Sequence, residues 1–206
     1  MTTAAVIYVL DDEPEMVAAL TRLLGARGFL VRGFTSALEF LDHERPPGPA
    51  CLVLDAAMPE MDGLQVHEHL RQRAEELPVI YLTGHGDIPM SVRAIKAGAE
   101  DFLTKPVQAE RLLSAIHRAL QRASDRQAER NDLEALRARL ASLTPREREV
   151  IQHVIAGKKN KQIAAAFGTG VQNIKVHRGR MMRKMEAKSL ADLVRMAEKL
   201  NILPKR

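Results

Sequence analysis

The sequence predicts two domains, an open α/β domain followed by an all-α domain. Short apolar runs alternate with segments of helical period up to about residue 120, and residues 144–206 contain helical patterns only. The charge also changes sign along the chain. Residues 1–120 hold 11 Lys and Arg against 17 Asp and Glu, whereas residues 144–206 hold 15 against 5. A strongly basic second domain is typical of proteins that bind a polyanion.

Five short runs rich in branched residues predict the strands of the first domain. They are VIYVL (6–10), LVRGF (30–34), CLVLD (51–55), VIYLT (79–83) and DFL (101–103). The segments between them place apolar residues at helical spacing, as Met16, Leu20 and Leu24 do. This alternation predicts a buried parallel sheet whose ligands bind at the carboxyl ends of the strands. Cys51 lies in the third run, where we expect a buried thiol.

Polar residues stand where four of these strands end. Asp11 and Asp12 follow the first, Asp55 and Thr83 end the third and fourth, and Lys105 follows the fifth. Because the carboxyl ends of parallel strands meet at one edge, these side chains are expected to converge. Crowded carboxylates favour a hard divalent cation, preferably Mg²⁺, and such a site can bring a phosphoryl group to one carboxylate. Taken singly, Asp12 would also serve as a helix cap and Lys105 as a solvated turn residue.

The motifs at these strand ends resemble the receiver domain of bacterial two-component response regulators. The resemblance covers residues 4–122 and rests on DD (11–12), DAAMPEMDG (55–63), TGHGD (83–87) and DFLTKP (101–106). It implies a flavodoxin-like (βα)₅ fold and phosphorylation of Asp55 by a partner sensor histidine kinase.

The resemblance also implies roles for the other residues of the pocket. Asp11, Asp12, Asp55 and the backbone carbonyl of Ala57 would hold Mg²⁺. Lys105 would contact the phosphoryl group. Thr83 and Phe102 match the pair that moves on phosphorylation, although an ordinary core position explains Phe102 equally well.

The stretch TGHGDIPMSVRAIKAGAEDFLTKP (83–106) is similar to the FixJ-type branch of the NarL/FixJ family. In that branch the fourth helix and the fifth strand form the dimer face after phosphorylation. The resemblance makes four residues candidates for this face: Ile88, Val92, Ile95 and Lys96. Ala57 departs from the branch, which often carries Arg there, and its small side chain leaves more room beside the phosphoryl group.

Residues 107–143 contain no Gly or Pro and predict a long helix between the two domains. The first part has an apolar face for the receiver, formed by Leu112, Leu113, Ile116, Ala119, Leu120 and Ala123. Further on, an a/d seam consists of Leu133, Leu136, Leu140 and Leu143. So short a seam leaves two interpretations open, a coiled coil between two chains or a helix that packs on its own domain. We therefore take 1–122 as the receiver domain, 123–140 as a helical linker and 141–206 as the second domain.

The second domain is predicted to contain four helices. Thr144, Pro145 and Glu147 form the signature of a capping box, and Gly157 ends the helix that it opens. The other three helices are NKQIAAAFG (160–168), VQNIKVHRGRMMRKM (171–185) and SLADLVRMAEKLNI (189–202), the last capped by its serine. A short helix, a Gly-containing turn and a cation-rich helix predict a helix-turn-helix. We expect core contacts from Val171, Ile174 and Met181 to hold the cation-rich helix.

Three motifs of this domain resemble the LuxR-type four-helix DNA-binding domain over residues 141–204. They are LTPRE (143–147), NKQIA (160–164) and KVHRGRMMRKM (175–185). The resemblance implies that the third helix enters the major groove of double-stranded DNA with Lys175 and Val176 facing the bases. Lys can bond guanine and Val can meet a thymine methyl group. Further phosphate or base candidates are Asn160, Lys161, Arg178 and Arg180, and Asn173, which replaces the usual Thr and is able to bond adenine.

These features together predict a DNA-binding transcription regulator controlled by phosphorylation. Phosphorylation of Asp55 would promote homodimerisation and promoter binding, with RNA polymerase as a further partner. Enzymatic activity would be limited to Mg²⁺-dependent self-phosphorylation and dephosphorylation at Asp55. The sequence contains no apolar run of transmembrane length and no basic-plus-apolar leader, so we expect a cytoplasmic protein without membrane contact.

Two alternatives from other classes stay open at this point. One is an Mg²⁺-dependent phosphotransfer enzyme with Asp55 as its nucleophile, for which no acid to protonate a leaving group is evident. The other is an adaptor whose basic domain meets an acidic protein. Turnover of free phosphoesters would support the enzyme, and salt-dependent, sequence-selective DNA binding would exclude the adaptor.

Overall fold

The computed structural model describes residues 5–46, 48–73, 75–84, 95 and 98–205 of the chain. Contacts divide the chain into two compact units, residues 1–127 and residues 128–206. Helix α5, Ala109–Ala141, contributes residues to both units.

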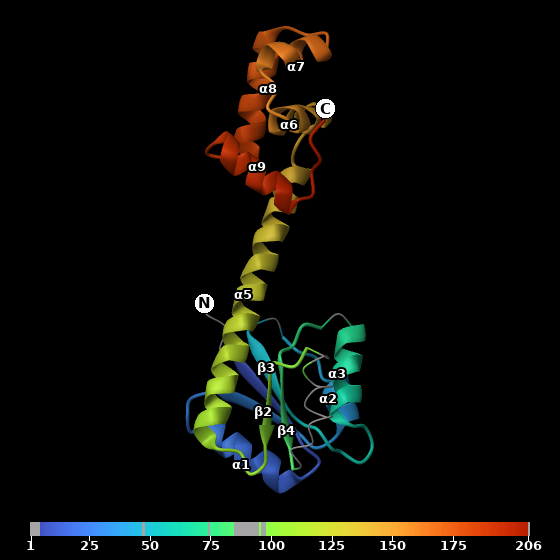
Figure 1. Cartoon of the computed structure of the whole chain (residues 1–206), viewed down its shortest axis with the longest axis vertical. Helices are drawn as coiled ribbons and strands as arrows, with labels where there is room; N and C mark the ends of the chain where they lie inside the picture. The colour runs from blue at the N-terminus through green and yellow to red at the C-terminus, as the bar shows by residue number, and fades with distance from the viewer. Residues whose placement is uncertain (1–4, 47, 74, 85–94, 96–97, 206) are drawn as a thin grey trace. The chain divides into compact units, whose positions relative to one another are not determined.

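The first unit contains a five-stranded parallel sheet with strand order β2-β1-β3-β4-β5 (Figure 1). Its strands are β1 (Val6–Leu10), β2 (Leu30–Phe34), β3 (Ala50–Asp55), β4 (Val79–Thr83) and β5 (Asp101–Thr104). All five predicted strands are confirmed. The three central strands carry little but apolar residues because helices cover both of their faces.

Alternate residues of the strands enter two separate cores. On one face, Tyr8 and Leu54 pack with residues of α2 (Ala37–Asp42) and α3 (Gly63–Gln72). On the other, Ile7 and Val53 pack with residues of α1 (Pro14–Gly25) and of the first part of α5. Cys51 belongs to this second core, and burial raises the pKa of its thiol to about 12, as expected for an inert thiol.

Gly63 lies where the first turn of α3 meets the end of β3. A Cβ atom here would stand 2.5 Å from the backbone oxygen of Asp55 and 3.0 Å from the ring of Tyr81. Gly63→Ala is therefore expected to destabilise the first unit by about 1–3 kcal/mol, because the backbone must shift to admit the methyl group.

Urea unfolding followed by tyrosine fluorescence measures the effect of Gly63→Ala. The chain has two tyrosines and no tryptophan, and both tyrosines, Tyr8 and Tyr81, lie in the first unit. Gly25→Ala is the control, since a Cβ there meets nothing within 4 Å. Equal unfolding midpoints for the two variants would contradict the close approach at Gly63.

Helix α5 has different apolar contacts at its two ends. Leu112, Ile116 and Ala119 are buried in the core of the first unit. In the second unit Leu136 is buried, and Leu140 packs on the core to which Leu143 belongs. Three of the four seam leucines are thus engaged within their own chain, which favours the helix that packs on its own domain.

Leu136→Ala tests this packing. We expect the second unit to lose about 2–4 kcal/mol of stability, because truncation of a buried leucine leaves a cavity. The loss should not depend on protein concentration when circular dichroism follows urea unfolding of the unphosphorylated chain. Leu133→Ala is the matched control, since Leu133 is only half-buried. A midpoint that rises with concentration in the wild type and not in Leu136→Ala would support a coiled coil instead.

The second unit contains four helices besides the end of α5 in the described part of the chain. They are α6 (Pro145–Ile155), α7 (Asn160–Ala166), α8 (Val171–Lys184) and α9 (Leu190–Lys199). The predicted caps are confirmed: Thr144 and Glu147 complete a capping box, and the Ser189 side chain accepts the Asp192 N–H. Gly157 has φ +78° and Gly168 has φ +59°, left-handed values that glycine adopts without strain.

The expected core contacts of α8 are partly wrong. Ile174 and Met181 are fully buried, but Val171 is 39% exposed. Val171 is the first residue of α8, and burial at a helix end depends on what the neighbouring elements cover. The apolar periodicity of one helix does not show which of its residues the neighbouring elements cover.

Candidate functional site

Three carboxylates meet at the carboxyl edge of the sheet in the first unit. Asp11 and Asp55 are 1% and 5% exposed, and Asp12 is half-buried. Each offers one oxygen, and these atoms all lie within 4.8 Å of one another. Asp12 is not a helix cap, because Glu13 is the N-cap of α1 and its N–H donates to Asp11 Oδ1 at 3.1 Å. The strand ends therefore bring the predicted carboxylates together.

Lys105 completes this acidic pocket. Its Nζ lies 2.7 Å from Asp11 Oδ2 and 3.1 Å from Asp55 Oδ2. The backbone positions it after β5, where the Lys105 N–H donates to the Thr83 carbonyl at 2.6 Å and the Lys105–Pro106 peptide is cis. The other oxygen of Asp55, Oδ1, accepts the Ala57 N–H at 3.3 Å.

The charges of the pocket are only partly balanced. Burial raises the pKa of Asp55, and the hydrogen bonds from Lys105 and from the Ala57 N–H oppose this shift without cancelling it. Burial lowers the pKa of Lys105, but its hydrogen bonds to Asp11 and Asp55 outweigh burial and leave the pKa raised. Three carboxylates lie around one ammonium here, so negative charge is in excess. The carboxylate oxygens form a donor set that suits Mg²⁺.

Thr83 and Phe102 lie on neighbouring strands beside the pocket. Thr83 ends β4 and is 4% exposed, whereas Phe102 is half-buried with its ring centroid 6.4 Å from that of Tyr81. Of the candidates for the dimer face, Ile88, Val92 and Lys96 lie outside the described residues. Ile95 is described, and it is helical and 65% exposed.

Sequence reasoning missed a buried polar pair between β4 and α3. The Tyr81 hydroxyl donates to the Gly63 carbonyl at 3.2 Å, and His67 Nδ1 lies 3.1 Å from the same hydroxyl. Burial lowers the pKa of His67, which favours the neutral form of the ring. His67 stands at an apolar position in the helical pattern of α3, and a histidine there was the one available signal.

Sequence reasoning also missed a cavity that adjoins the acidic pocket at Asp12. The structure has a cavity of about 230 Å³ beside Asp12. Its lining includes Thr35, Ser36, Met58 and Met61, from the loops after β2 and β3. The sequence gives no pattern that assigns these loop residues to one wall.

The cation-rich helix α8 presents two residues without competing contacts. Lys175 is exposed and Val176 is 42% exposed, and the Lys175 ammonium has no polar contact within the described residues. Lys161 and Arg180 are exposed as well. At its start α8 lacks a side-chain cap, because Gly170 is the N-cap.

Three other candidates on this surface are engaged within the domain. Asn173 Nδ2 donates to Thr169 Oγ1 at 3.1 Å. Arg178 Nη1 donates to Asn160 Oδ1 at 3.1 Å, which links α8 to α7. Contacts with an external ligand would have to replace or share these hydrogen bonds, so Lys175 and Val176 are the more accessible pair.

An acidic pocket at the edge of a parallel sheet and a basic helix-turn-helix thus occur in one chain. Together they define a class, the signal-responsive transcription regulators, in which one domain receives a signal and the other binds DNA. No helix within the described ranges is both long and apolar enough to cross a membrane.

The chain belongs to the NarL/FixJ family of response regulators. Residues 7–117 match the response regulator receiver domain, and residues 141–197 match the luxR family of bacterial regulatory proteins. The chain is 44% identical to response regulator protein TodT of Pseudomonas putida over 96% of this chain and 87% of TodT. It is 39% identical to transcriptional regulatory protein FixJ of Bradyrhizobium diazoefficiens over 98% of this chain and 99% of FixJ.

Solved structures agree with this assignment. Response regulator StyR is 42% identical with a TM-score of 0.87, over 96% of this chain and all of the StyR chain. Full-length FixJ from B. japonicum is 38% identical with a TM-score of 0.59, over 98% of this chain and all of that chain. The predicted fold classes of both domains are confirmed. A regulatory DNA-binding role follows from the family, and it leaves the phosphotransfer enzyme and the adaptor without support.

Proposed function

We propose that a sensor histidine kinase phosphorylates Asp55 and thereby controls promoter binding by the second domain. The position of the Lys105 ammonium supports this proposal most directly, because the ammonium lies within hydrogen-bonding distance of both Asp11 and Asp55. An Asp55 carboxylate oxygen would attack the phosphorus of a phosphohistidine, forming an O–P bond as the P–N bond breaks. Lys105 would turn from the carboxylates to the incoming phosphoryl oxygens and neutralise their charge.

The pocket would hold Mg²⁺ through Asp11, Asp12, Asp55 and the backbone carbonyl of Ala57. The crowding of three carboxylates against one ammonium supports this ligand set. When bound, the cation would neutralise charge that develops on the phosphoryl oxygens. The chain would then catalyse nothing beyond its own phosphorylation and dephosphorylation at Asp55.

Asp12→Asn tests the proposed Mg²⁺ site. Mg²⁺ affinity, measured by calorimetric titration, is expected to fall at least about tenfold, because affinity in such sites follows the number of charged ligands. Glu13→Gln is the matched control, since it removes one negative charge from the exposed neighbouring residue. An equal loss in the two variants would show that general charge, and not a site at Asp12, sets the affinity.

Phosphorylation would act on the rest of the receiver through Thr83 and Phe102. Thr83 would move toward the phosphoryl group and Phe102 would turn inward, changing the face formed by Ile88, Val92, Ile95 and Lys96. Dimerisation through this face would bring two basic domains to paired half-sites, so that weak single-site binding becomes strong. Activation is then a shift between populations of one protein.

The second domain would bind the major groove of promoter DNA through α8. Lys175 and Val176 would face the bases, and their exposure supports these roles. Contacts to phosphates or to further bases would come from Asn160, Lys161, Asn173, Arg178 and Arg180. RNA polymerase would be a partner at the promoter. With promoter DNA as its target, the protein would act in the cytoplasm.

Selection of duplexes from a randomised pool tests the whole proposal. The wild-type chain, treated with a small phosphodonor and Mg²⁺, is expected to enrich a sequence with two related half-sites. Enrichment of unrelated sequences alone would reduce the second domain to a general polyanion binder.

A further inference from the structure

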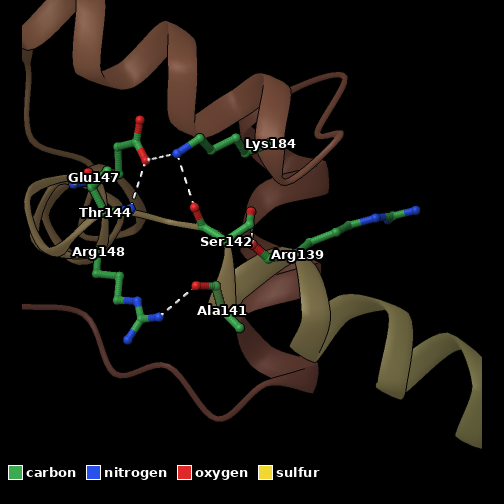
Figure 2. Close-up of polar contacts among 7 residues, drawn as sticks. All are labelled: Arg139, Ala141, Ser142, Thr144, Glu147, Arg148 and Lys184. Atoms are coloured by element: carbon green, nitrogen blue, oxygen red, sulfur yellow. Dashed lines mark hydrogen bonds and ion pairs between the residues drawn. The ribbon is translucent and has the colours of Figure 1, made fainter.

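The end of helix α5 is bound by side chains from two other helices of the second unit. Arg148, on α6, donates through Nη2 to the Ala141 carbonyl at 2.9 Å. Lys184, the last residue of α8, donates through Nζ to the Ser142 carbonyl at 3.0 Å. Figure 2 shows the Arg148 side chain reaching Ala141, the last residue of α5, and the Lys184 side chain reaching Ser142, the residue after it. Carbonyls at a helix end lack partners within the helix, so these cations supply them.

The same ammonium binds the buried carboxylate at the start of α6. Lys184 Nζ lies 2.7 Å from Glu147 Oε2, and this oxygen also accepts the Thr144 N–H at 2.9 Å (Figure 2). Glu147 is 2% exposed. Burial raises the pKa of Glu147, but the hydrogen bonds from Lys184 and Thr144 outweigh burial and the net pKa is lowered. The Lys184 ammonium at the end of α8 therefore pairs with the Glu147 carboxylate of the capping box that begins α6.

A second ion pair joins α5 to the turn that follows α8. Arg139 Nη2 lies 2.6 Å from a carboxylate oxygen of Glu186, which has a left-handed φ of 56°. Both ion pairs lie at the carboxyl end of α8. Lys175 precedes Lys184 by nine positions, which corresponds to about 13 Å along a helix axis.

From these contacts we infer that Lys184 is a positioning residue that fixes the direction of α8 relative to the end of α5. The inference rests on the proposed role of α8 in DNA binding. One ammonium joins the last residue of α8, the first turn of α6 and the turn after α5, so these three parts move together. In a dimer on DNA, the direction of α8 relative to the end of α5 would then contribute to the distance between the two α8 helices. Lys184 thereby sets the half-site spacing that the dimer accepts.

A direct phosphate contact explains Lys184 less well. Its side chain is 35% exposed, and its ammonium already has two acceptors within the domain. The neighbouring Arg183 is exposed and has no side-chain polar contact among the residues that the structure describes. A phosphate contact at this end of α8 would fall to Arg183 first.

Lys184→Met tests the inference, because it keeps the length of the stem and removes the ammonium. The full chain is treated with phosphodonor and Mg²⁺ and is then titrated with three kinds of selected duplex. The first carries two half-sites at the preferred spacing, the second carries them at spacings changed by one to three base pairs, and the third carries a single half-site. We expect affinity at the preferred spacing to fall about tenfold and the preference among spacings to flatten. Single-site affinity should change less than about twofold.

Three further variants separate positioning from other roles. Lys188→Met is the matched control, since Lys188 is exposed and its ammonium forms no ion pair within the described residues; it should behave as the wild type does. Lys184→Arg should restore most of the spacing preference, because it restores a cation. Glu147→Gln should share the effect of Lys184→Met. An equal loss on single and paired sites, or an unchanged spacing preference, would overturn the inference.

A measurement without DNA separates this inference from the proposed function. Amide hydrogen exchange over residues 138–147 of the full chain should be about tenfold faster in Lys184→Met and unchanged in Lys188→Met. If no variant binds DNA selectively, the proposed function fails while this exchange result still decides whether Lys184 holds α8 to α5. Equal exchange rates in Lys184→Met and Lys188→Met would show that the Lys184 contacts do not hold α8 to the end of α5, and would overturn the inference.

Discussion

Asp55→Asn is expected to abolish phosphorylation and the dimerisation that depends on it. The amide that replaces the carboxylate is not a nucleophile for phosphorus, and Lys105 keeps its contact with Asp11. The variant should therefore fold normally, incorporate no phosphoryl group from a small phosphodonor with Mg²⁺, and stay at the sedimentation coefficient of the untreated protein. The wild type should incorporate one phosphoryl group and shift toward a dimer.

Asp42→Asn is the control for Asp55→Asn. Asp42 ends α2 and is exposed, so this variant removes the same charge without touching the pocket. It should dimerise as the wild type does. Dimerisation of Asp55→Asn that equals that of the wild type, with phosphodonor and Mg²⁺ present, would contradict the mechanism.

Lys175→Met is expected to have the second large effect. If Lys175 bonds a guanine, its removal should weaken binding to the selected duplex by about 1–3 kcal/mol, or roughly 5- to 150-fold. Selectivity should relax at one base position per half-site. Titration of the phosphodonor-treated chain with duplexes substituted at each position measures both effects.

Lys188→Met is again the matched control, because it removes the same charge from an exposed position of the same unit. A loss that is the same for every duplex, and that lowers the salt dependence by about one counterion, would show instead that Lys175 contacts a phosphate. An effect no larger than that of Lys188→Met would remove Lys175 from the interface.

The acidic pocket was predictable because parallel strands present their carboxyl ends at one edge. That rule places Asp11, Asp12, Asp55 and Lys105 together from strand positions alone. The Tyr81–His67 pair and the loop residues beside Asp12 were not predictable, since each depends on how a helix or loop lies over the sheet. Sequence spacing does not specify that.

In the second domain, local signals were reliable and distant pairs were not. The capping box of Thr144 and Glu147 is a pattern over four residues, and the structure has it. The contact of Glu147 with Lys184 joins residues 37 positions apart, and no local pattern announces it. The a/d seam was likewise ambiguous, because a short leucine repeat fits a partner chain and a neighbouring helix of the same domain equally well.

The central claim is that the state of Asp55 controls DNA binding, and one titration tests it most directly. The affinity of the wild-type chain for the selected two-half-site duplex is measured at fixed salt before and after treatment with phosphodonor and Mg²⁺. The account predicts a rise of at least about tenfold on treatment, absent from Asp55→Asn. Equal affinities of the wild type before and after treatment, with Asp55 shown to be phosphorylated, would contradict it.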